Sequence, residues 1–346
     1  MRNFRQSPKP AVIPLHPIEY EADEQHKWDS LFEEIKPESY RVEPIETLSV
    51  PGDAPKDVLR IREDITNQQK TKKAAEEWTV YIAKVGSKWY PIESVTEQIF
   101  TRLGQALGFA MADSRLCIVG GQVRFLSRYF LQDGQESLVH GLEIFKEYVG
   151  PELADEVARQ RNEREVYTFQ IVCAAMQERF PEEFAELMRG FVSMLAFDAL
   201  VGNNDRHPGN WGVIEPLRRN QPRRFAPIYD TARGLFWQNK NEYVSQCLKD
   251  PNQLQAYVRK SRPQIGWDGL TNAKRWTHFD LAKHICSEHP EWRELYENVT
   301  SSDIETSWRS LCETEFSYLS AARRDAIGRC LALRQKQLVE AIREDP

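Results

Sequence analysis

The sequence lacks the features of a membrane protein or a secreted protein. It has no run of 18 apolar residues, and its first residues, MRNFRQSPKPAVIPLHP, do not contain the apolar core of a signal peptide. Six cysteines are scattered over 346 residues without a paired spacing, which is typical of reduced, mostly buried thiols. These absences exclude a disulfide-stapled secreted domain and predict a cytoplasmic protein with no membrane partner.

The sequence also lacks the standard signatures of a zinc site and of a nucleotide site. His284, Cys286 and His289 lie close together, but no second ligand pair accompanies them and their spacing fits no zinc pattern. Neither a Walker A motif nor a G-x-G-x-x-G loop occurs in the chain. A nucleotide site in this protein must therefore use a different loop for the phosphates.

Positive charge is not in excess. The chain has 46 Lys and Arg residues and 52 Asp and Glu residues, so its formal net charge is -6. An acidic chain has little general affinity for nucleic acid, so we expect no direct nucleic-acid binding. One basic cluster, Arg218, Arg219, Arg223 and Arg224, is either a solvated turn or a contact for an acidic partner.

What the chain does contain is the run GNNDRHPGN, residues 202–210. Asp205 and Asn210 are five positions apart. At this interval one loop can direct an aspartate at a substrate hydroxyl while its asparagine binds Mg²⁺ on ATP. The alternative is that both residues only shape a turn, because Asp, Asn, Pro and Gly are the usual turn residues.

A second carboxylate suited to Mg²⁺, Asp230, ends the strand-like run RFAPIYD. We expect Trp211–Ile214 and Phe225–Tyr229 to be the two strands of a hairpin, because turn residues separate them. Such a hairpin returns Asp230 to the neighbourhood of Asn210. Asp198, in the apolar helix before the loop, is expected to be a buried acid that organises the loop, with Arg206 and His207 bracing it.

The order of the elements predicts an α+β protein with a bilobal, protein-kinase-like fold. Residues 1–44 are expected to form an N-terminal arm with one short helix near Trp28–Ile35. A small strand-rich lobe is expected over residues 45–132, and a larger helical lobe that carries the 202–210 loop over residues 133–346. The elements expected within the lobes are strands at 78–85 and 123–131, a helix at 92–107 that stops at Gly108, an amphipathic helical segment at 151–179, a helix at 183–201, and a C-terminal helix.

In a fold of this kind a lysine on a strand of the first lobe binds the α- and β-phosphates of ATP, and a glutamate on the adjacent helix holds it. Lys84 ends the alternation Trp78, Val80, Ile82, Lys84, and Glu97 lies on the following helix. Lys84 can instead be a surface lysine, Glu97 can pair with Ser94 in a capping box, and Glu93 is a rival partner for the lysine.

The loop before the lysine strand, SVPGDAPKDVLRI, contains Ser49, Gly52 and Lys56. Exposed backbone amides and one positive charge suit a turn that covers phosphates. The pattern alone has low specificity, because many loops contain proline and glycine.

With these segments in the order SVPGDAPK, YIAK, TEQIFTRLGQALG, GNNDRHPGN and APIYD, the chain resembles the HipA-like serine/threonine kinases from about residue 49 to residue 230. The resemblance implies an ATP- and Mg²⁺-dependent protein kinase in which Asp205 is catalytic and Asn210 and Asp230 bind the metal. It further implies that Lys84 binds ATP with Glu97 as its partner, and that Ser49, Gly52 and Lys56 belong to the phosphate loop.

The same resemblance implies that Ser49 is a site of autophosphorylation. It also suggests a toxin–antitoxin component, an antitoxin-like partner, and an aminoacyl-tRNA synthetase as the protein substrate. The N-terminal subdomain of longer family members is not expected within the 44 residues that precede the first lobe, so its contacts do not carry over.

Two other functions stay open at this point. The DRHPGN loop is also similar to the D-x-H-x-x-N loop of aminoglycoside and choline kinases and to that of phosphatidylinositol kinases. A pseudokinase that serves as an interaction module is the non-enzymatic alternative, and retention of every expected polar group argues against it.

Overall fold

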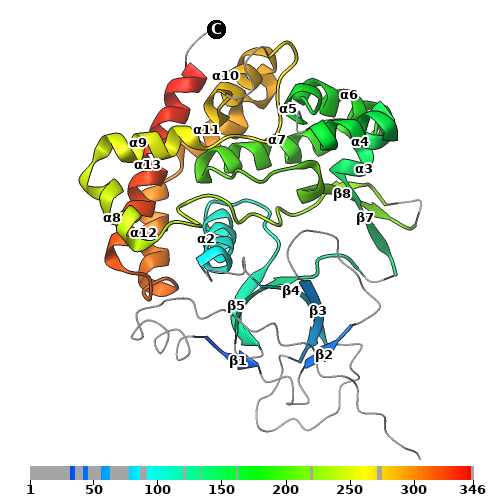
Figure 1. The fold of residues 1–346 in the computed structure, drawn as a ribbon. Coiled ribbons are helices and arrows are strands. Elements are labelled where there is room, and N and C mark those ends of the chain that lie inside the picture. Colours follow the sequence, from blue (N-terminus) through cyan, green and yellow to red (C-terminus); the bar gives the residue numbers. More distant parts are fainter. Residues whose placement is uncertain are drawn as a thin grey trace, which may run out of the picture.

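The computed structural model describes residues 32–35, 42–45, 56–62, 78–85, 92–119, 122–132, 134–160, 163–218, 221–270 and 275–343. Over these residues a smaller, strand-rich part precedes a larger helical part (Figure 1). The predicted α+β architecture, with a strand sheet first and helices after it, is therefore confirmed. The domain boundaries placed after residues 44 and 132 stay predictions.

The first part is built on a six-stranded sheet with the order β1-β5-β6-β4-β3-β2. Only the β1–β5 pairing is parallel. In β4, TVYIAKV, β-branched and aromatic residues favour the extended chain, and alternate side chains such as Tyr81 and Ala83 enter a small apolar core. The strands are β1 (Glu34–Ile35), β2 (Val42–Pro44), β3 (Lys56–Ile61), β4 (Thr79–Val85), β5 (Ser114–Val119) and β6 (Gln122–Arg128).

Two strands of this sheet come from the segment expected to be an N-terminal arm. β1 pairs with β5, and β2 pairs with β3. The helix predicted near Trp28–Ile35 is wrong for Glu34–Ile35, while residues 28–31 lie outside the described part of the chain. Pairing at the sheet edge buries Ile35, and this gain outweighs the local helix pattern.

The helix predicted at residues 92–107 is α2 (Ile92–Ala106), and Gly108 ends it with a φ of 82° that disfavours other residues. Its apolar stripe is buried, as the helical spacing predicted. The helix packs on β5 and β6 of the sheet and also on α12 (Ile304–Thr314), and Phe100 meets Phe197 of the helical part edge to face. α2 therefore lies between the two parts of the molecule (Figure 1).

The helical part surrounds α7 (Phe184–Val201), the helix predicted at residues 183–201. Every residue from Met194 to Val201 is buried. A Cβ at Gly190 of this helix would lie 2.6 Å from Cβ of Phe225, so the close packing at this point requires a glycine. Around α7 lie α3 (Gly141–Val149), α4 (Pro151–Gln160), α5 (Glu163–Val166), α6 (Phe169–Arg179), α8 (Asn241–Lys249), α9 (Pro251–Lys260), α10 (His278–Glu288), η3 (Pro290–Trp292), α11 (Arg293–Ser301), α12 and α13 (Ala321–Arg343).

The segment predicted as helical at residues 151–179 is three helices, α4, α5 and α6. Thr168 breaks the pattern because its side chain accepts a hydrogen bond from the Ile171 amide and caps α6. Thr168 also forms a β-bridge with Gly266. The C-terminal helix, α13, is present as predicted.

A second, three-stranded sheet has the order β7-β8-β9 and consists of β7 (Glu136–His140), β8 (Gly212–Pro216) and β9 (Arg224–Phe225). β8 and β9 form the hairpin predicted after the loop. The second strand is shorter than the predicted Phe225–Tyr229, because Ile228 leaves the hairpin and forms a parallel bridge with Met111. Two of the four clustered arginines of the hairpin are ion-paired, Arg223 with Glu215 and Glu183 and Arg224 with Glu136.

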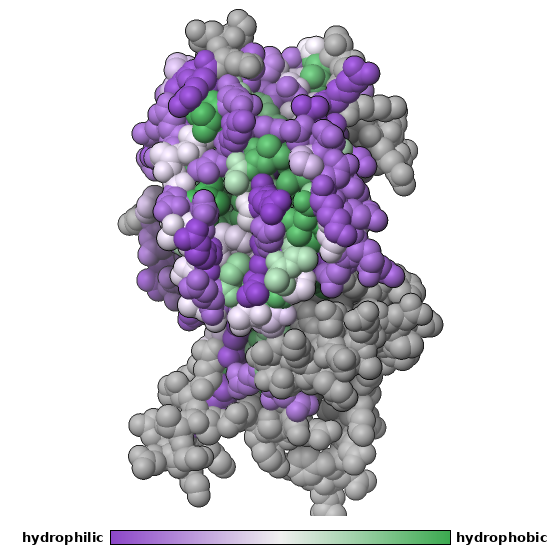
Figure 2. All heavy atoms as spheres, turned by 90° about the vertical axis from the view of Figure 1, so that its left-hand side faces the viewer, coloured by the Kyte–Doolittle hydropathy of each residue, from purple (hydrophilic) through white to green (hydrophobic). Residues whose placement is uncertain are grey.

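The outside of the helical part is mostly polar. Figure 2 shows apolar side chains near the middle of one face, interrupted and surrounded by hydrophilic ones. Ion pairs one helical turn apart, such as Arg309–Glu305 and Arg329–Asp325, add to this exterior. Among the described helices, none combines the length and the apolarity needed to cross a bilayer.

Candidate active site

The loop at residues 202–210 is fixed to the end of α7 by a buried ion pair between Arg206 and Asp198. Gly202 ends α7 with a φ of 69° and turns the chain into the loop. Asp198, on the last turn of α7, accepts hydrogen bonds from Nε and Nη2 of Arg206 at 2.8 and 3.0 Å and from Asn203 at 2.9 Å. Asp198 therefore organises the loop, as the sequence predicted, and its charge is compensated by a guanidinium.

The same guanidinium connects the loop to the segment that carries Asp230. Nη1 of Arg206 donates to the carbonyl oxygens of Asn210 and Tyr229 at 2.6 and 2.8 Å, and Nη2 donates to Oγ1 of Thr231 at 2.7 Å. Asp230 lies between Tyr229 and Thr231 and is thus placed beside Asn210. The proximity that the predicted hairpin implied is present.

Hydrogen bonds within the loop set the positions of Asp205 and Asn210. Nδ2 of Asn210 donates to the carbonyl oxygen of Asp205 at 2.8 Å, and Nδ1 of His207 accepts from the Gly209 amide at 3.1 Å. Asn210 is nearly buried, with 6% of its surface exposed. The side chains of Arg206 and His207 brace the loop, which agrees with the prediction that they support it.

Lys84 joins the two parts of the molecule. Its Nζ lies 2.5 Å from Oε1 of Glu97 on α2 and 2.8 Å from Oδ1 of Asp230. Lys84 and Glu97 are buried, while the side chain of Asp230 is 26% exposed. The capping box that Ser94 and Glu97 can form is absent, because α2 begins at Ile92 and Ser94 lies inside it.

The pKa shifts of this cluster follow from burial and from the sharing of one ammonium group by two carboxylates. Burial opposes the charge of Lys84, but Asp230 and Glu97 outweigh burial and raise the pKa of Lys84. Burial likewise opposes the charge of Asp230, but Lys84 and Lys56 hold its pKa well below the usual range. Burial raises the pKa of Glu97 to about 7, against the attraction of Lys84.

Lys56, the last residue of the predicted phosphate loop, faces the same carboxylate. It lies opposite Lys84 in the β3–β4 register, and its Nζ is 3.1 Å from Oδ2 of Asp230. The other two residues predicted for this loop, Ser49 and Gly52, lie outside the described residues. Two ammonium groups therefore converge on Asp230, a density of positive charge that suits the phosphates of a nucleotide.

The backbone of Asp230 is strained. Its φ is 53°, in the left-handed region that disfavours residues with a Cβ. Leu235 and Phe236, a few residues later, also have positive φ values. Conformations of this kind persist where the surrounding contacts enforce them, and they cluster at functional sites.

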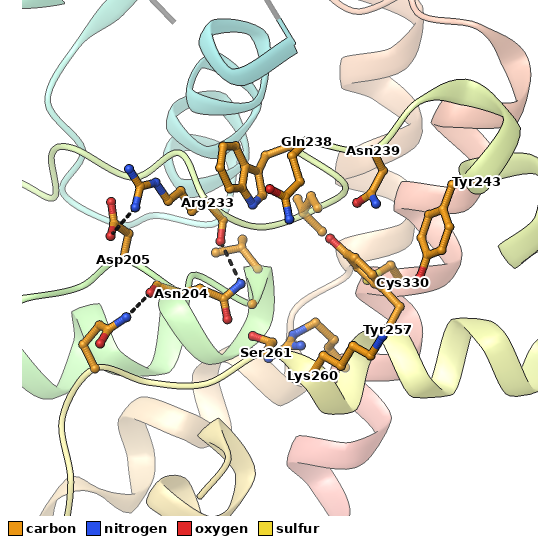
Figure 3. Close-up of a pocket in the computed structure, with 16 residues that line it drawn as sticks. Asn204, Asp205, Arg233, Gln238, Asn239, Tyr243, Tyr257, Lys260, Ser261 and Cys330 are labelled. Atoms are coloured by element: carbon orange, nitrogen blue, oxygen red, sulfur yellow. Dashed lines mark hydrogen bonds and ion pairs between the residues drawn. The ribbon is translucent and has the colours of Figure 1, made fainter. Parts of the chain in front are cut away.

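Asp205 faces Arg233, a residue that belongs to none of the sequence motifs. Nη1 of Arg233 lies 3.0 Å from Oδ1 of Asp205, and the guanidinium also lies over the ring of Trp237 (Figure 3). Burial raises the pKa of Asp205, while Arg233 and His207 oppose this shift. The signal in the sequence was the single basic residue in TARGLF, directly after Asp230.

The donor set next to the loop suits a hard cation. Asp230 offers carboxylate oxygens and Asn210 an amide oxygen, the ligand types that Mg²⁺ prefers. Both Asp230 oxygens contact lysine ammonium groups in this structure, which places positive charge where the metal would bind. No cluster of three His, Cys, Asp or Glu residues in a metal-binding arrangement occurs in the described chain, and this includes the region of His284, Cys286 and His289.

Comparison with known proteins yields a family model described as the HipA-like C-terminal domain, which matches residues 48–308. A serine/threonine-protein kinase of Helicobacter pylori, CtkA, is 30% identical over 91 residues. That alignment covers 26% of this chain and 27% of the relative, so the sequence match spans about a quarter of the curated protein.

Two solved structures share the fold. The crystal structure of the Helicobacter pylori proinflammatory kinase CtkA matches with a TM-score of 0.66 and 17% identity, over 89% of this chain and 96% of that chain. The Shewanella oneidensis MR-1 toxin–antitoxin complex of HipA, HipB and operator DNA matches with a TM-score of 0.51 and 14% identity, over 90% and 76%. At these identities the likeness establishes the architecture.

Proposed function

Since this chain belongs to the HipA-like C-terminal domain family, we propose that it is a kinase that transfers phosphate from ATP to a serine or threonine hydroxyl of a protein. The observation that carries the proposal is the position of Lys84, whose ammonium group bridges Glu97 on α2 and Asp230 beside the loop. A lysine–glutamate pair joined to a metal-binding aspartate is the arrangement that phosphoryl transfer in this fold class requires.

In this proposal the nucleotide binds between the two parts of the molecule. Lys84 and Lys56 bind its phosphates, and Glu97 keeps the ammonium group of Lys84 in place. Ser49 and Gly52 complete the phosphate loop. Asn210 and Asp230 hold Mg²⁺, which when bound neutralises the negative charge that builds up on the phosphates.

Asp205 orients the acceptor hydroxyl and accepts its proton. Burial raises the pKa of this carboxyl, which brings it closer to that of an efficient proton acceptor at neutral pH. Arg233 lies on the same carboxylate and keeps it ionised before the acceptor arrives. Arg206 takes no part in proton transfer, because its guanidinium is buried among Asp198, two carbonyl oxygens and Thr231.

The acceptor and partners follow from the family rather than from this site. One structural relative was solved with HipB and operator DNA as part of a toxin–antitoxin system. We extend to this chain the corresponding expectations of an antitoxin-like protein partner, of an aminoacyl-tRNA synthetase as the protein substrate, and of autophosphorylation at Ser49.

Intact-mass analysis after incubation with Mg-ATP tests the kinase activity. Wild type is compared with Asp205→Asn, which is nearly isosteric, and with Asp325→Asn, a matched change at a surface ion pair of α13. We expect a phosphate on wild type and Asp325→Asn and none on Asp205→Asn, with peptide mapping placing it at Ser49.

Equal phosphorylation of Asp205→Asn would remove the proposed role of Asp205. If no variant gains phosphate, calorimetry with ATP and Mg²⁺ decides between the remaining functions. Binding of the nucleotide would leave a kinase with an external acceptor, whereas loss of binding would support a pseudokinase.

A further inference from the structure

A cavity of about 530 Å³ lies next to Asp205, and Lys84 is not among the residues that line it (Figure 3). Its wall includes the end of α7 with the start of the loop, the segment from Arg233 to Asn239, and parts of α8, α9 and α13. Its volume is within the range of sites that bind small ligands or a few side chains. Asp205 and its partner Arg233 stand at one edge, so a molecule in the cavity reaches the proposed catalytic carboxylate.

Two buried polar side chains in the cavity wall have atoms without a hydrogen-bond partner. Ser261 is 8% exposed and Arg334 is 1% exposed, and both Oγ of Ser261 and Nη2 of Arg334 lack a partner. The other nitrogens of Arg334 donate to the carbonyl oxygens of Ala199 and Val258 at 2.8 and 3.2 Å. Buried polar atoms in native proteins are nearly always satisfied, so these two atoms are available to a ligand group or to a water molecule in the cavity.

The two side chains meet beneath the loop. A Cβ on Gly202 would lie 2.9 Å from Nη1 of Arg334 and 3.1 Å from Oγ of Ser261. Gly202 is three residues before Asp205 in the sequence. A group bound by Ser261 and Arg334 is therefore anchored to the same loop that carries the catalytic carboxylate.

The charge around the cavity favours an anion. Arg334 has no carboxylate partner among the described residues, and burial lowers its pKa to about 10, so the cation is only partly compensated. Lys260 and Arg233 also line the wall, and Asp205, which pairs with Arg233, is the single acidic residue among those that line it. This excess of positive charge contrasts with the chain as a whole, whose formal net charge is -6.

Neutral groups around the cavity suit a polar, hydrogen-bonding ligand. The side chains of Gln238 and Asn239 are carboxamides that both donate and accept, and Tyr243 and Tyr257 contribute aromatic walls (Figure 3). The carboxamide of Asn204 is already held by the Arg233 carbonyl oxygen and the Arg262 amide. A carboxylate or phosphate held by Arg334 and Ser261 can thus belong to a larger polar molecule.

We propose that this cavity is the acceptor site, in which Ser261 and Arg334 bind a carboxylate or phosphate of the acceptor while its hydroxyl lies at Asp205. The inference rests on the proposed kinase function and specifies its substrate class: a hydroxyl-bearing acceptor with an acidic group close to the hydroxyl. That acidic group belongs either to a side chain of a protein segment or to a free small acid, and the binding chemistry is the same for both.

Thermal unfolding with inorganic phosphate, at constant ionic strength, tests the anion site without requiring catalysis. Ser261→Ala removes only a hydroxyl that has no partner, so the variant is expected to fold as well as wild type. Ser94→Ala is the matched control, because the buried Ser94 hydroxyl in α2 also lacks a partner and lies outside the cavity wall. We expect Ser261→Ala to need about tenfold more phosphate than wild type or Ser94→Ala for the same rise in Tm.

The proposed nucleotide site also attracts phosphate, and Lys56→Ala separates the two sites. Phosphate that binds in the cavity still stabilises Lys56→Ala, and the further change Ser261→Ala reduces that response. An identical phosphate response in wild type, Ser261→Ala and Ser94→Ala would overturn the inference. So would a response abolished by Lys56→Ala alone.

Transfer assays identify the source of the acidic group. Serine peptides with aspartate or phosphoserine beside the acceptor are compared with alanine and lysine versions, and with free hydroxy acids such as glycerate. We expect wild type to prefer the acidic peptides or acids, and Ser261→Ala to lose that preference by raising KM about tenfold with little change in kcat.

These experiments distinguish failure of the proposed acceptor site from failure of the proposed kinase function. Transfer with no preference for acidic acceptors, and no effect of Ser261→Ala on phosphate binding, would refute the acceptor site while leaving a kinase. Phosphate binding that depends on Ser261, with neither transfer nor binding of ATP and Mg²⁺, would leave the anion site and remove the kinase function.

Discussion

The two sides of the proposed catalytic centre differ in how their polar groups are satisfied. On the nucleotide side, Lys84 contacts two carboxylates and Asp230 contacts two ammonium groups. On the cavity side, Ser261 and Arg334 keep buried atoms without partners. The nucleotide side is thus internally neutralised in the structure, whereas the cavity side keeps two buried polar atoms that a ligand can satisfy.

On the nucleotide side, charged side chains from different parts of the chain compensate one another, so these charges are satisfied without a ligand. Lys84 on β4, Glu97 on α2 and Asp230 after the hairpin come from separate elements and compensate one another. In the cavity wall, Arg334 on α13 donates to two carbonyl oxygens and lies over the ring of Phe279, and none of these groups carries the negative charge that would offset its own.

Lys84→Met breaks the nucleotide side and is expected to have the largest effect. It leaves Glu97 and Asp230 as two neighbouring carboxylates, so the free energy of unfolding should fall by about 3 kcal/mol and phosphoryl transfer should be lost. Urea denaturation and a transfer assay measure both. Lys336→Met on exposed α13 is the control, with an expected change within about 0.5 kcal/mol. Equal effects of the two variants would contradict the importance of the bridge.

Glu97→Gln tests how the stability of the nucleotide side depends on pH. The pKa of Glu97 in the folded protein, about 7, is above its value in the unfolded chain, so the folded state binds more protons between these values. The stabilising contribution of Glu97 is therefore complete below the unfolded pKa and is lost as pH rises toward 7, at about 1.4 kcal/mol per pH unit.

Denaturation at pH 5 and pH 7 tests this sign. The free energy of unfolding of wild type should fall relative to that of Glu97→Gln over this interval, because the amide does not titrate. A difference between the two proteins that is constant with pH would show that Glu97 is ionised throughout.

Arg233→Gln removes the charge that pairs with Asp205, the residue between the nucleotide side and the cavity side. Arg233 opposes the rise in the pKa of Asp205, so the amide should shift the acidic limb of the kcat/KM profile to higher pH and reduce transfer a few-fold at pH 6. Arg329→Gln, at a surface pair, should leave the profile unchanged. An unshifted limb in Arg233→Gln would mean that Asp205 does not depend on Arg233 for its ionisation.

The smallest effect on stability is expected for Ser261→Ala, on the cavity side, when no anion is present. Ser261→Ala removes a buried hydroxyl that has no partner, so stability in anion-free buffer should be unchanged or higher by less than about 1 kcal/mol. Calorimetric unfolding measures it beside Ser94→Ala. Breaking a buried hydrogen bond costs about 1–3 kcal/mol. If Ser261→Ala lowers the free energy of unfolding by about 2 kcal/mol or more, the hydroxyl has a hydrogen-bond partner after all.

The nucleotide side could be anticipated from the sequence because its residues sit in local motifs. The spacing of Asp205 and Asn210, the strand that ends at Lys84 and the helical position of Glu97 are each readable in a short window. The structure brings Lys84, Glu97 and Asp230 together, while the catalytic and metal-binding roles stay predictions.

The cavity side could not be anticipated, because Ser261 and Arg334 are separated from Asp205 by 56 and 129 positions and belong to no motif. Their meeting at Gly202 depends on how α13 packs against both α7 and α9. The short strand β1 was missed for a related reason, since its partner β5 lies about 80 residues further along the chain.

The contacts of Arg206 have a consequence for the order of folding. Its guanidinium binds Asp198 on α7, the Asn210 and Tyr229 carbonyl oxygens, and Thr231. During synthesis, α7 and the loop leave the ribosome before Tyr229 and Thr231 exist, so at that stage Arg206 can satisfy only part of its donors. A chain stalled before Thr231 therefore carries the 202–210 motif without the contacts that place it beside Asp230.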